Sequence, residues 1–347
     1  MSYPRVPLLD FIPAFPPPLD IVVLLAFAIA LGVLVWCPQM KRLGLLWFVA
    51  AVFLALQDQS RLEPWFIEYL LLLFAVFFSR DNSAAFSGCR MILAAVYFWS
   101  GVHKMNTSFA TKLFPWLVSP VLKLDSESMI QVVGAAVPFL EIGMAVALLF
   151  PKTRRIGVIA IVVMHLFLLA VLGPWALDWN NVVMPWNVAM IVLVPVLFWE
   201  SKASSKALFA WSGSNWAYRA ILVFVLVLPP LSLAGLWDTS PSFALYSGNQ
   251  LIGSVVLSSE AWEHQDSQTR SAAEHIGNRY RLRIDDWSVL AMNVPAYPAE
   301  RVLRRIAQSF CAAARSEDDV IFILEQPPRW FYRAGWHRIE NSRELCR

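Results

Sequence analysis

The chain has 347 residues, of which 58% are hydrophobic and only 15% are charged, and its mean hydropathy is +0.55. Soluble domains contain about 25% charged residues, so this composition excludes an ordinary soluble protein and indicates one embedded in a lipid bilayer. The net charge of +3 is small, and no basic cluster resembles a nucleic-acid footprint, so no nucleic-acid partner is expected.

Eight apolar segments precede residue 238, and each approaches the roughly 17–25 residues of helix that cross a bilayer. They cover residues 20–37, 43–57, 64–79, 90–105, 128–150, 156–173, 184–199 and 217–236. The fourth segment begins only after Arg90. We therefore expect an α-helical polytopic membrane bundle of about eight transmembrane helices over residues 1–238.

The basic residues of the connecting loops are unevenly distributed. Lys41, Arg80, Lys152 and Lys202 follow the first, third, fifth and seventh segments, whereas the alternate loops are acidic or mixed. Because basic loops stay in the cytoplasm, we expect a multi-pass protein of the cell inner (plasma) membrane with its N- and C-termini outside. The N-terminus does not have the pattern of a removable signal peptide, and none is expected.

The composition changes sharply after Asp238. Residues 239–347 are charged and contain no run that could span a membrane, which indicates a small extracytoplasmic α+β domain. Strands are expected at 254–257, 280–284 and 320–324, and an amphipathic helix at 298–315. Outside the cell, Cys311 and Cys346 would lie in an oxidising compartment. Either they form a disulfide, or Cys311 is a small core residue of the helix.

Polar residues gather at the outer ends of the second, third, fourth and seventh segments. These residues are Asp58, Arg61, Trp65, Lys104, Asn106, Trp186 and Asn187. On the fourth helix, spacings of three and four place Tyr97, Ser100 and Lys104 on one face. His103 points about 100° away from Lys104. Together these groups predict a small-molecule binding site at the mouth of the bundle.

Two further ionisable residues lie near the middle of apolar segments, Glu141 in the fifth and His165 in the sixth. Such groups normally face the bundle interior and have a partner, so they pair with each other or with Lys104. All three are candidate catalytic residues. A partly dehydrated lysine gives up its proton more readily and can act as a general base, while Glu141 and His165 would relay protons.

Each candidate also has a purely structural interpretation. Lys104 is alternatively a lysine that snorkels to the interface, and the tryptophans an interfacial belt. Glu141 and His165 are alternatively a polar tie between helices, worth about 0.6–2 kcal/mol. Asp58 and Arg61 are alternatively an exposed ion pair of little energy. No zinc spacing, catalytic triad or nucleotide-binding motif occurs, so no metal is expected.

The segment Tyr97-Phe-Trp-Ser-Gly-Val-His-Lys-Met-Asn106 resembles the Tyr-x-x-(Ala/Ser)-Gly-x-x-Lys-(Leu/Met)-(Asn/Asp) helix of the HTTM domain. That domain is the membrane domain of vitamin K-dependent gamma-carboxylase and its bacterial relatives, and DoxX- and MauE-like membrane proteins look similar. In the carboxylase this lysine is the base proposed to deprotonate vitamin K hydroquinone. The resemblance thus implies a quinone- or quinol-like molecule, with Lys104 in the role of that base. The chain has no counterpart of the large lumenal domain of the carboxylase.

Two functions of different classes follow. The first is an enzyme that holds a quinol or other lipid-soluble substrate near the outer leaflet, with Lys104 as base and with Asp58, Arg61 and Asn187 orienting the substrate. The second is a non-catalytic membrane subunit that presents residues 239–347 to a periplasmic protein partner. Alternating-access transport ranks third, because the chain shows no inverted repeat.

Overall fold

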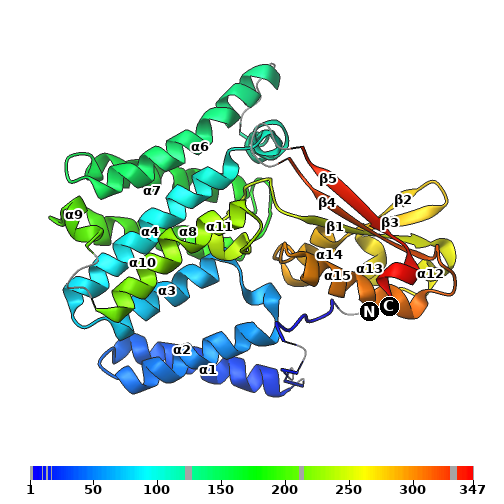
Figure 1. The fold of residues 1–347 in the computed structure, drawn as a ribbon, viewed down its shortest axis with the longest axis horizontal. Helices are drawn as coiled ribbons and strands as arrows, with labels where there is room; N and C mark the ends of the chain where they lie inside the picture. Colours follow the sequence, from blue (N-terminus) through cyan, green and yellow to red (C-terminus); the bar gives the residue numbers. More distant parts are fainter. Residues whose placement is uncertain are drawn as a thin grey trace.

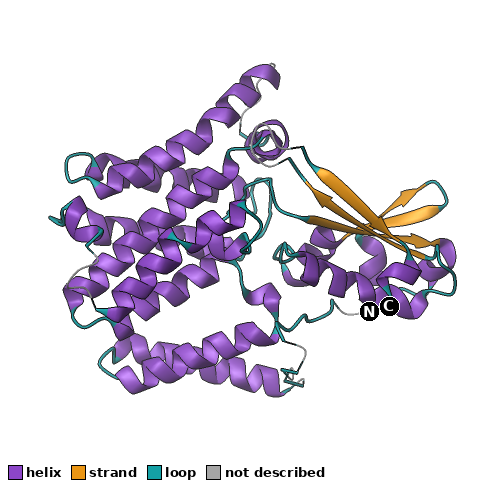
Figure 2. Cartoon of the chain, viewed as in Figure 1, coloured by secondary structure: helices purple, strands orange, loops and turns teal. Residues whose placement is uncertain are grey.

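The computed structural model describes residues 3–9, 11, 12, 15, 16, 18–121, 127–210, 215–328 and 334–346. Most of this chain is helical, and the strands form one small antiparallel sheet at one end of the helices (Figures 1 and 2). We refer to helices α1 to α11 as the helical bundle and to residues 252–346 as the sheet unit.

Each of the eight apolar segments forms helix. The helices are α1 (Leu19–Trp36), α2 (Lys41–Gln57), α3 (Pro64–Phe78), α4 (Asn82–Lys104), α6 (Glu127–Leu149), α7 (Arg154–Leu172), α8 (Val183–Phe198), and α10 (Trp216–Leu226) followed by α11 (Leu228–Leu233). Within the described residues, five helical stretches are long and apolar enough to cross a membrane, including α10 with α11 as one stretch. Because α3 and α8 are shorter apolar helices, the expected count of eight spans is not confirmed.

Helix α4 begins earlier than the hydropathy predicts. The carboxylate of Asp81 accepts a hydrogen bond from the backbone N–H of Ala84 at 2.9 Å and caps a helix that starts at Asn82. Arg90 therefore lies inside α4, where its Nε donates to the carbonyl of Leu197 at 2.6 Å. The charge of Arg90 did not mark the start of the helix, because its guanidinium has a hydrogen-bond acceptor on the neighbouring helix α8.

Short helical segments connect the long helices. They are η1 (Gln59–Arg61), the π-helical η2 (Phe109–Leu113), α5 (Phe114–Val118), α9 (Ser205–Leu208) and η3 (Ser240–Ser242). Figure 1 shows α4 running between α6 and α7 on one side and α3 and α10 on the other. The crossing with α6 is close, since a Cβ on Gly101 would lie 2.8 Å from the carbonyl oxygen of Pro138. This glycine brings Lys104 and Glu141 within reach of each other.

The sheet has the strand order β2-β3-β1-β4-β5, and its pairs are antiparallel. The strands are β1 (Ile252–Ser258), β2 (Ala273–Ile276), β3 (Arg279–Arg283), β4 (Val320–Gln326) and β5 (Trp336–Glu340). The helices of the sheet unit are α12 (Ser259–Glu263), α13 (Ser267–Ser271), α14 (Ile284–Met292), α15 (Glu300–Gln308), η4 (Ser309–Ala313) and α16 (Ser342–Leu345). Figure 1 shows α14 and α15 beneath one face of the sheet. The three expected strands are the three central ones, and the two edge strands were not predicted.

The expected amphipathic helix is α15 followed by η4. Val302, Ile306 and Phe310 are buried against the sheet, as their spacing predicts. Cys311 in η4 forms a disulfide with Cys346, with the two Cα atoms 5.7 Å apart. Of the two interpretations of Cys311, the structure therefore shows the disulfide.

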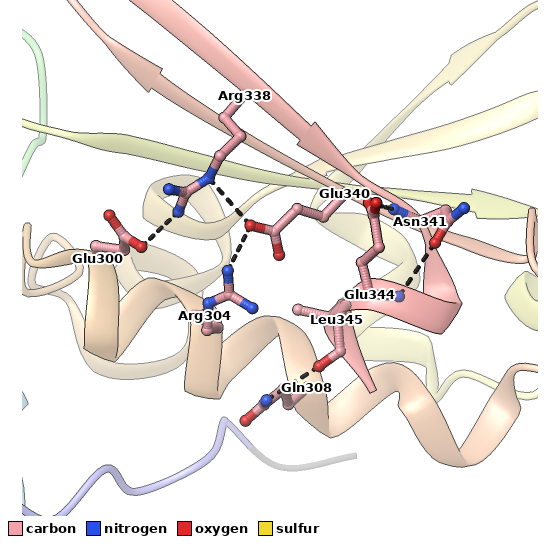
Figure 3. Close-up of polar contacts among 8 residues, drawn as sticks. All are labelled: Glu300, Arg304, Gln308, Arg338, Glu340, Asn341, Glu344 and Leu345. Atoms are coloured by element: carbon pink, nitrogen blue, oxygen red, sulfur yellow. Dashed lines mark hydrogen bonds and ion pairs between the residues drawn. The ribbon is translucent and has the colours of Figure 1, made fainter. Parts of the chain in front are cut away.

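The polar side of α15 fastens the C-terminal strand and helix (Figure 3). Arg304 pairs with Glu340, and Arg338 pairs with both Glu300 and Glu340. One turn further along α15, Gln308 donates to the carbonyl of Leu345 at 3.0 Å. These contacts, with the disulfide, hold β5 and α16 against α15.

The N-terminal segment also packs on the sheet unit. The ring of Tyr3 lies 4.8 Å from that of Trp287 between centroids, and Val6 is buried in the same hydrophobic cluster as Leu345. Both ends of the chain therefore lie at the same end of the helical bundle (Figure 1).

Candidate functional site

A cavity of about 490 Å³ lies among α4, α6, α7 and α8, and the segment Leu245–Tyr246 closes one side of it. We call it the site cavity. The candidate residues that line it are Tyr97, Ser100, Lys104, Glu141, His165, Trp186 and Asn187. Most of its other wall residues are apolar, among them Met144, Val163 and Leu168. The structure thus brings together the deeper part of the predicted constellation.

Lys104 and Glu141 form a buried ion pair across the crossing of α4 and α6. The Lys104 Nζ lies 2.9 Å from Glu141 Oε2 and donates to Ser100 Oγ at 2.5 Å. The two charged residues are 6% and 7% exposed. Lys104 is therefore not an interfacial snorkelling lysine, and Glu141 pairs with it and not with His165. An ammonium in such a pair donates hydrogen bonds but has no lone pair with which to accept a proton.

His165 is the centre of a second polar cluster on the facing wall and is fully buried. Its Nδ1 lies 2.7 Å from Asn187 Oδ1, and its Nε2 lies 2.9 Å from the Tyr97 hydroxyl. Because Asn187 Nδ2 donates to the carbonyl of Val183 at 2.8 Å, its Oδ1 is the acceptor and His165 Nδ1 carries the proton. The Nε2 of a neutral imidazole is then an acceptor, to which Tyr97 donates.

Trp186 supports the imidazole from a third side. Its ring packs edge-to-face against His165 at 5.4 Å, and its Nε1 donates to Glu68 Oε2 at 3.0 Å. Glu68 lies on α3 and is fully buried. Glu68 was not among the predicted site residues, although a carboxylate between Ile67 and Tyr69 in an apolar run is the same signal that identified Glu141.

Asp58 and Arg61 lie outside the site cavity. Asp58 Oδ1 accepts from the backbone N–H of Ser60 at 3.2 Å and caps η1. The guanidinium of Arg61 donates to the carbonyl of Leu54 at 2.9 Å. Neither the predicted substrate-orienting role nor an exposed ion pair agrees with these positions, because both side chains stabilise the turn after α2.

The remaining candidates also have structural partners. Asn106 Nδ2 donates to the carbonyls of His103 and Ser247, at 2.9 and 2.7 Å, and its Oδ1 accepts from the N–H of Phe109 at 2.8 Å. The His103 ring lies 3.3 Å from the hydroxyl of Ser232. Trp65 lines a different cavity, of about 530 Å³, between the helical bundle and the sheet unit.

The turn before β1 contributes residues that sequence reasoning did not assign to the site. Tyr246 lines both the site cavity and the neighbouring cavity, and its backbone is left-handed with φ of +45°. Gly248 has φ of +70°, and a Cβ there would lie 3.0 Å from the backbone nitrogen of Phe109. A glycine is therefore required for this turn to lie against η2.

Among the described residues, no three His, Cys, Asp or Glu side chains are grouped so that they could hold a metal ion. The walls of the site cavity are mostly apolar, and their polar groups include an ammonium paired with a carboxylate and a phenol hydrogen-bonded to an imidazole. This combination suits a molecule with an apolar body and an oxygen-bearing head.

The family model described as Methylamine utilisation protein MauE matches residues 82–181. The matched region contains α4, α6 and α7 and therefore includes Lys104, Glu141 and His165. No curated protein matches the chain, and no solved structure matches it. Together with the apolar helices, the match identifies a membrane-embedded protein. No comparison supports the HTTM or DoxX resemblance, or the activity of the gamma-carboxylase.

Proposed function

We propose that this membrane-embedded protein binds a lipid-soluble molecule of the quinone or quinol class in the site cavity and moves a proton to or from its polar head. The observation that carries the proposal is the pair of buried polar clusters, Lys104 with Glu141 and Tyr97 with His165, on the walls of one apolar cavity. Ionisable groups inside a membrane are costly, and they commonly mark substrate and proton pathways.

We assign the base differently from the sequence resemblance. Lys104 is paired with a carboxylate, so its role is that of a fixed positive charge. Tyr97 can accept a proton from a bound hydroxyl while its own proton passes to His165 Nε2. The ammonium of Lys104 stabilises the negative charge that remains on the bound oxygen. Asn187 keeps the imidazole in the tautomer that can accept this proton.

The proposal includes the inner membrane, with both chain ends and the 239–347 domain on the outer side. The Cys311–Cys346 disulfide supports this orientation, because disulfides persist in oxidising compartments. Reporter fusions at Pro151 and Ser201 should read cytoplasmic, and a fusion at the C-terminus should read external. A cytoplasmic signal from the C-terminal fusion would contradict the orientation.

The first experiment is native mass spectrometry with lipid extraction on the purified protein. Wild type is compared with Lys104→Ala and His165→Gln, and the matched control is Lys152→Ala at an exposed loop position. We expect a lipid-soluble molecule to co-purify with wild type and control and to be lost from both site variants. Equal retention in all four proteins, or no bound molecule in any, would contradict the proposal.

A second candidate function is the non-catalytic membrane subunit that presents residues 239–347 to a periplasmic protein. One observation favours it: Lys104 and Glu141 are partners of each other, and His165 has two partners, as in polar ties between helices. For this function, replacing Lys104 and Glu141 together by methionine would leave activity in the cell intact. Deleting residues 239–347 would abolish it.

A further inference from the structure

A second, larger cavity lies on the other side of α3 from the site cavity. It has a volume of about 930 Å³ and runs between α2, α3 and α10. Phe48, Val52, Leu70, Phe74 and Phe224 are among its apolar wall residues. Its wall on α2 extends from Phe48 to Leu56, about 12 Å at 1.5 Å per residue. We call this cavity the lateral groove.

One end of the lateral groove is polar, and the polar residues come from the sheet unit and the segment before it. Asp238, Tyr297 and Arg301 line this end. Arg301 pairs with Asp238 through both terminal nitrogens, and its Nε donates to Gln59 Oε1 at 2.9 Å. Gln59 lies two residues beyond the end of α2, so the charged pair lies near the end of an apolar helix.

The side chains of Arg301 and Asp238 can each make a further interaction with a ligand. Among the residues that the structure describes, three N–H groups of Arg301 donate to Asp238 and Gln59, and the Tyr297 hydroxyl is a further partner of the guanidinium. The carboxylate of Asp238 accepts three hydrogen bonds, including one from the Tyr297 hydroxyl at 2.7 Å, out of about four that it can accept. Burial raises the pKa of Asp238, but the hydrogen bonds from Arg301 and Tyr297 outweigh it and lower the pKa below its ordinary value. Side-chain exposures of 46% for Arg301 and 28% for Asp238 leave both charges accessible.

We propose that the lateral groove binds one zwitterionic phospholipid of the surrounding bilayer. Its acyl chains lie along the apolar walls of α2, α3 and α10. Its phosphate lies against the exposed side of the Arg301 guanidinium, and its ammonium lies against Asp238. The neighbouring opposite charges complement a head group that also carries both signs. An anionic lipid has no ammonium and would place its negative charge beside the Asp238 carboxylate.

The test reconstitutes the full-length protein in nanodiscs of equimolar phosphatidylethanolamine and phosphatidylglycerol. Tightly bound lipid is then counted by native mass spectrometry after delipidation. Ala220→Trp fills the lateral groove from an exposed position on α10, and Ala136→Trp is the matched control at an exposed position on α6. We expect wild type and control to retain one phosphatidylethanolamine, and Ala220→Trp to lose at least tenfold in occupancy.

The double variant Arg301→Gln/Asp238→Asn tests the polar end separately. We expect this variant to retain the two lipids in equal amounts, because the charged pair is gone while the apolar walls remain. Equal retention of phosphatidylethanolamine by wild type and Ala220→Trp would overturn the site. Retention of phosphatidylglycerol by wild type as well as phosphatidylethanolamine would overturn the assignment of the head group.

Discussion

Breaking the Lys104–Glu141 ion pair from one side should destabilise the protein far more than removing both charges. With Glu141→Leu, the ammonium of Lys104 stays 6% exposed and retains only the hydroxyl of Ser100. Breaking a buried pair costs about 3–5 kcal/mol because one charge is left uncompensated. Lys104→Met should cost about as much, since Glu141 is then the unpaired charge.

The double variant Lys104→Met/Glu141→Leu leaves no charge unpaired and should lie within about 1 kcal/mol of wild type. Unfolding free energies of the four proteins in detergent micelles, followed by tryptophan fluorescence, give the coupling energy of the pair. Lys152→Met, at an exposed position, is the control and should be neutral. If the double variant costs the sum of the two single variants, or each single variant costs under about 1 kcal/mol, the two residues do not form a buried ion pair.

Three further predictions concern the region where the helical bundle and the sheet unit meet, and the sheet unit itself. Burial and the charge of Asp285 raise the pKa of Glu63 to about 8, and burial raises that of Asp285 to about 6. The unfolded chain loses these protons at lower pH than the folded one, so the stability of the folded protein should fall as pH rises from about 4 to about 8. In Glu63→Gln, the unfolding temperature should no longer depend on pH in the upper part of this range. Cys346→Ser opens the disulfide to Cys311, which joins residues 35 apart, and should cost about 3–4 kcal/mol in denaturant unfolding; reductant should bring wild type to the same value. Asn106→Ala removes three hydrogen bonds and should cost about 3 kcal/mol by the same assay.

Each of these predictions has a contradicting outcome. The first requires that wild type and Glu63→Gln differ in their pH profiles, and parallel profiles would contradict it. The second requires a response to reductant, so a wild type that unfolds identically with and without dithiothreitol would contradict it. The third requires a loss of stability, so an Asn106→Ala variant that unfolds at the same denaturant concentration as wild type would contradict it.

Apolar length predicted where the helices lie but not where they begin or how many cross the bilayer. Hydropathy excluded the start of α4 because Arg90 carries a charge, and only the tertiary structure reveals its acceptor at Leu197. In the sheet unit, β4 was recognisable because it alternates buried and half-buried residues. The edge strands β2 and β5 are mostly exposed, so they lack the alternation by which strands are identified.

The candidate site, like the fold, was predicted only in part from the sequence. Helical spacing predicted that Tyr97, Ser100 and Lys104 share a face, and all three line the site cavity. The partner of Lys104 stayed open among alternatives because the crossing of α4 and α6 depends on tertiary packing at Gly101. Asp58 was expected at the site because it lies at a helix end, but that place is equally compatible with a cap, and Asp58 accepts a hydrogen bond from the Ser60 N–H and does not line the site cavity. Hydropathy does not distinguish an aspartate that caps a helix from one that binds a substrate.

The turn before β1 connects the wall of the site cavity directly to the sheet unit. Tyr246 is part of the cavity wall, and β1 begins at Ile252, so only a few residues separate the wall of the site cavity from this strand. Asn106, two residues beyond Lys104, is hydrogen-bonded to the Ser247 carbonyl within this turn. The end of α4 that carries Lys104 is therefore hydrogen-bonded to the segment that leads into β1.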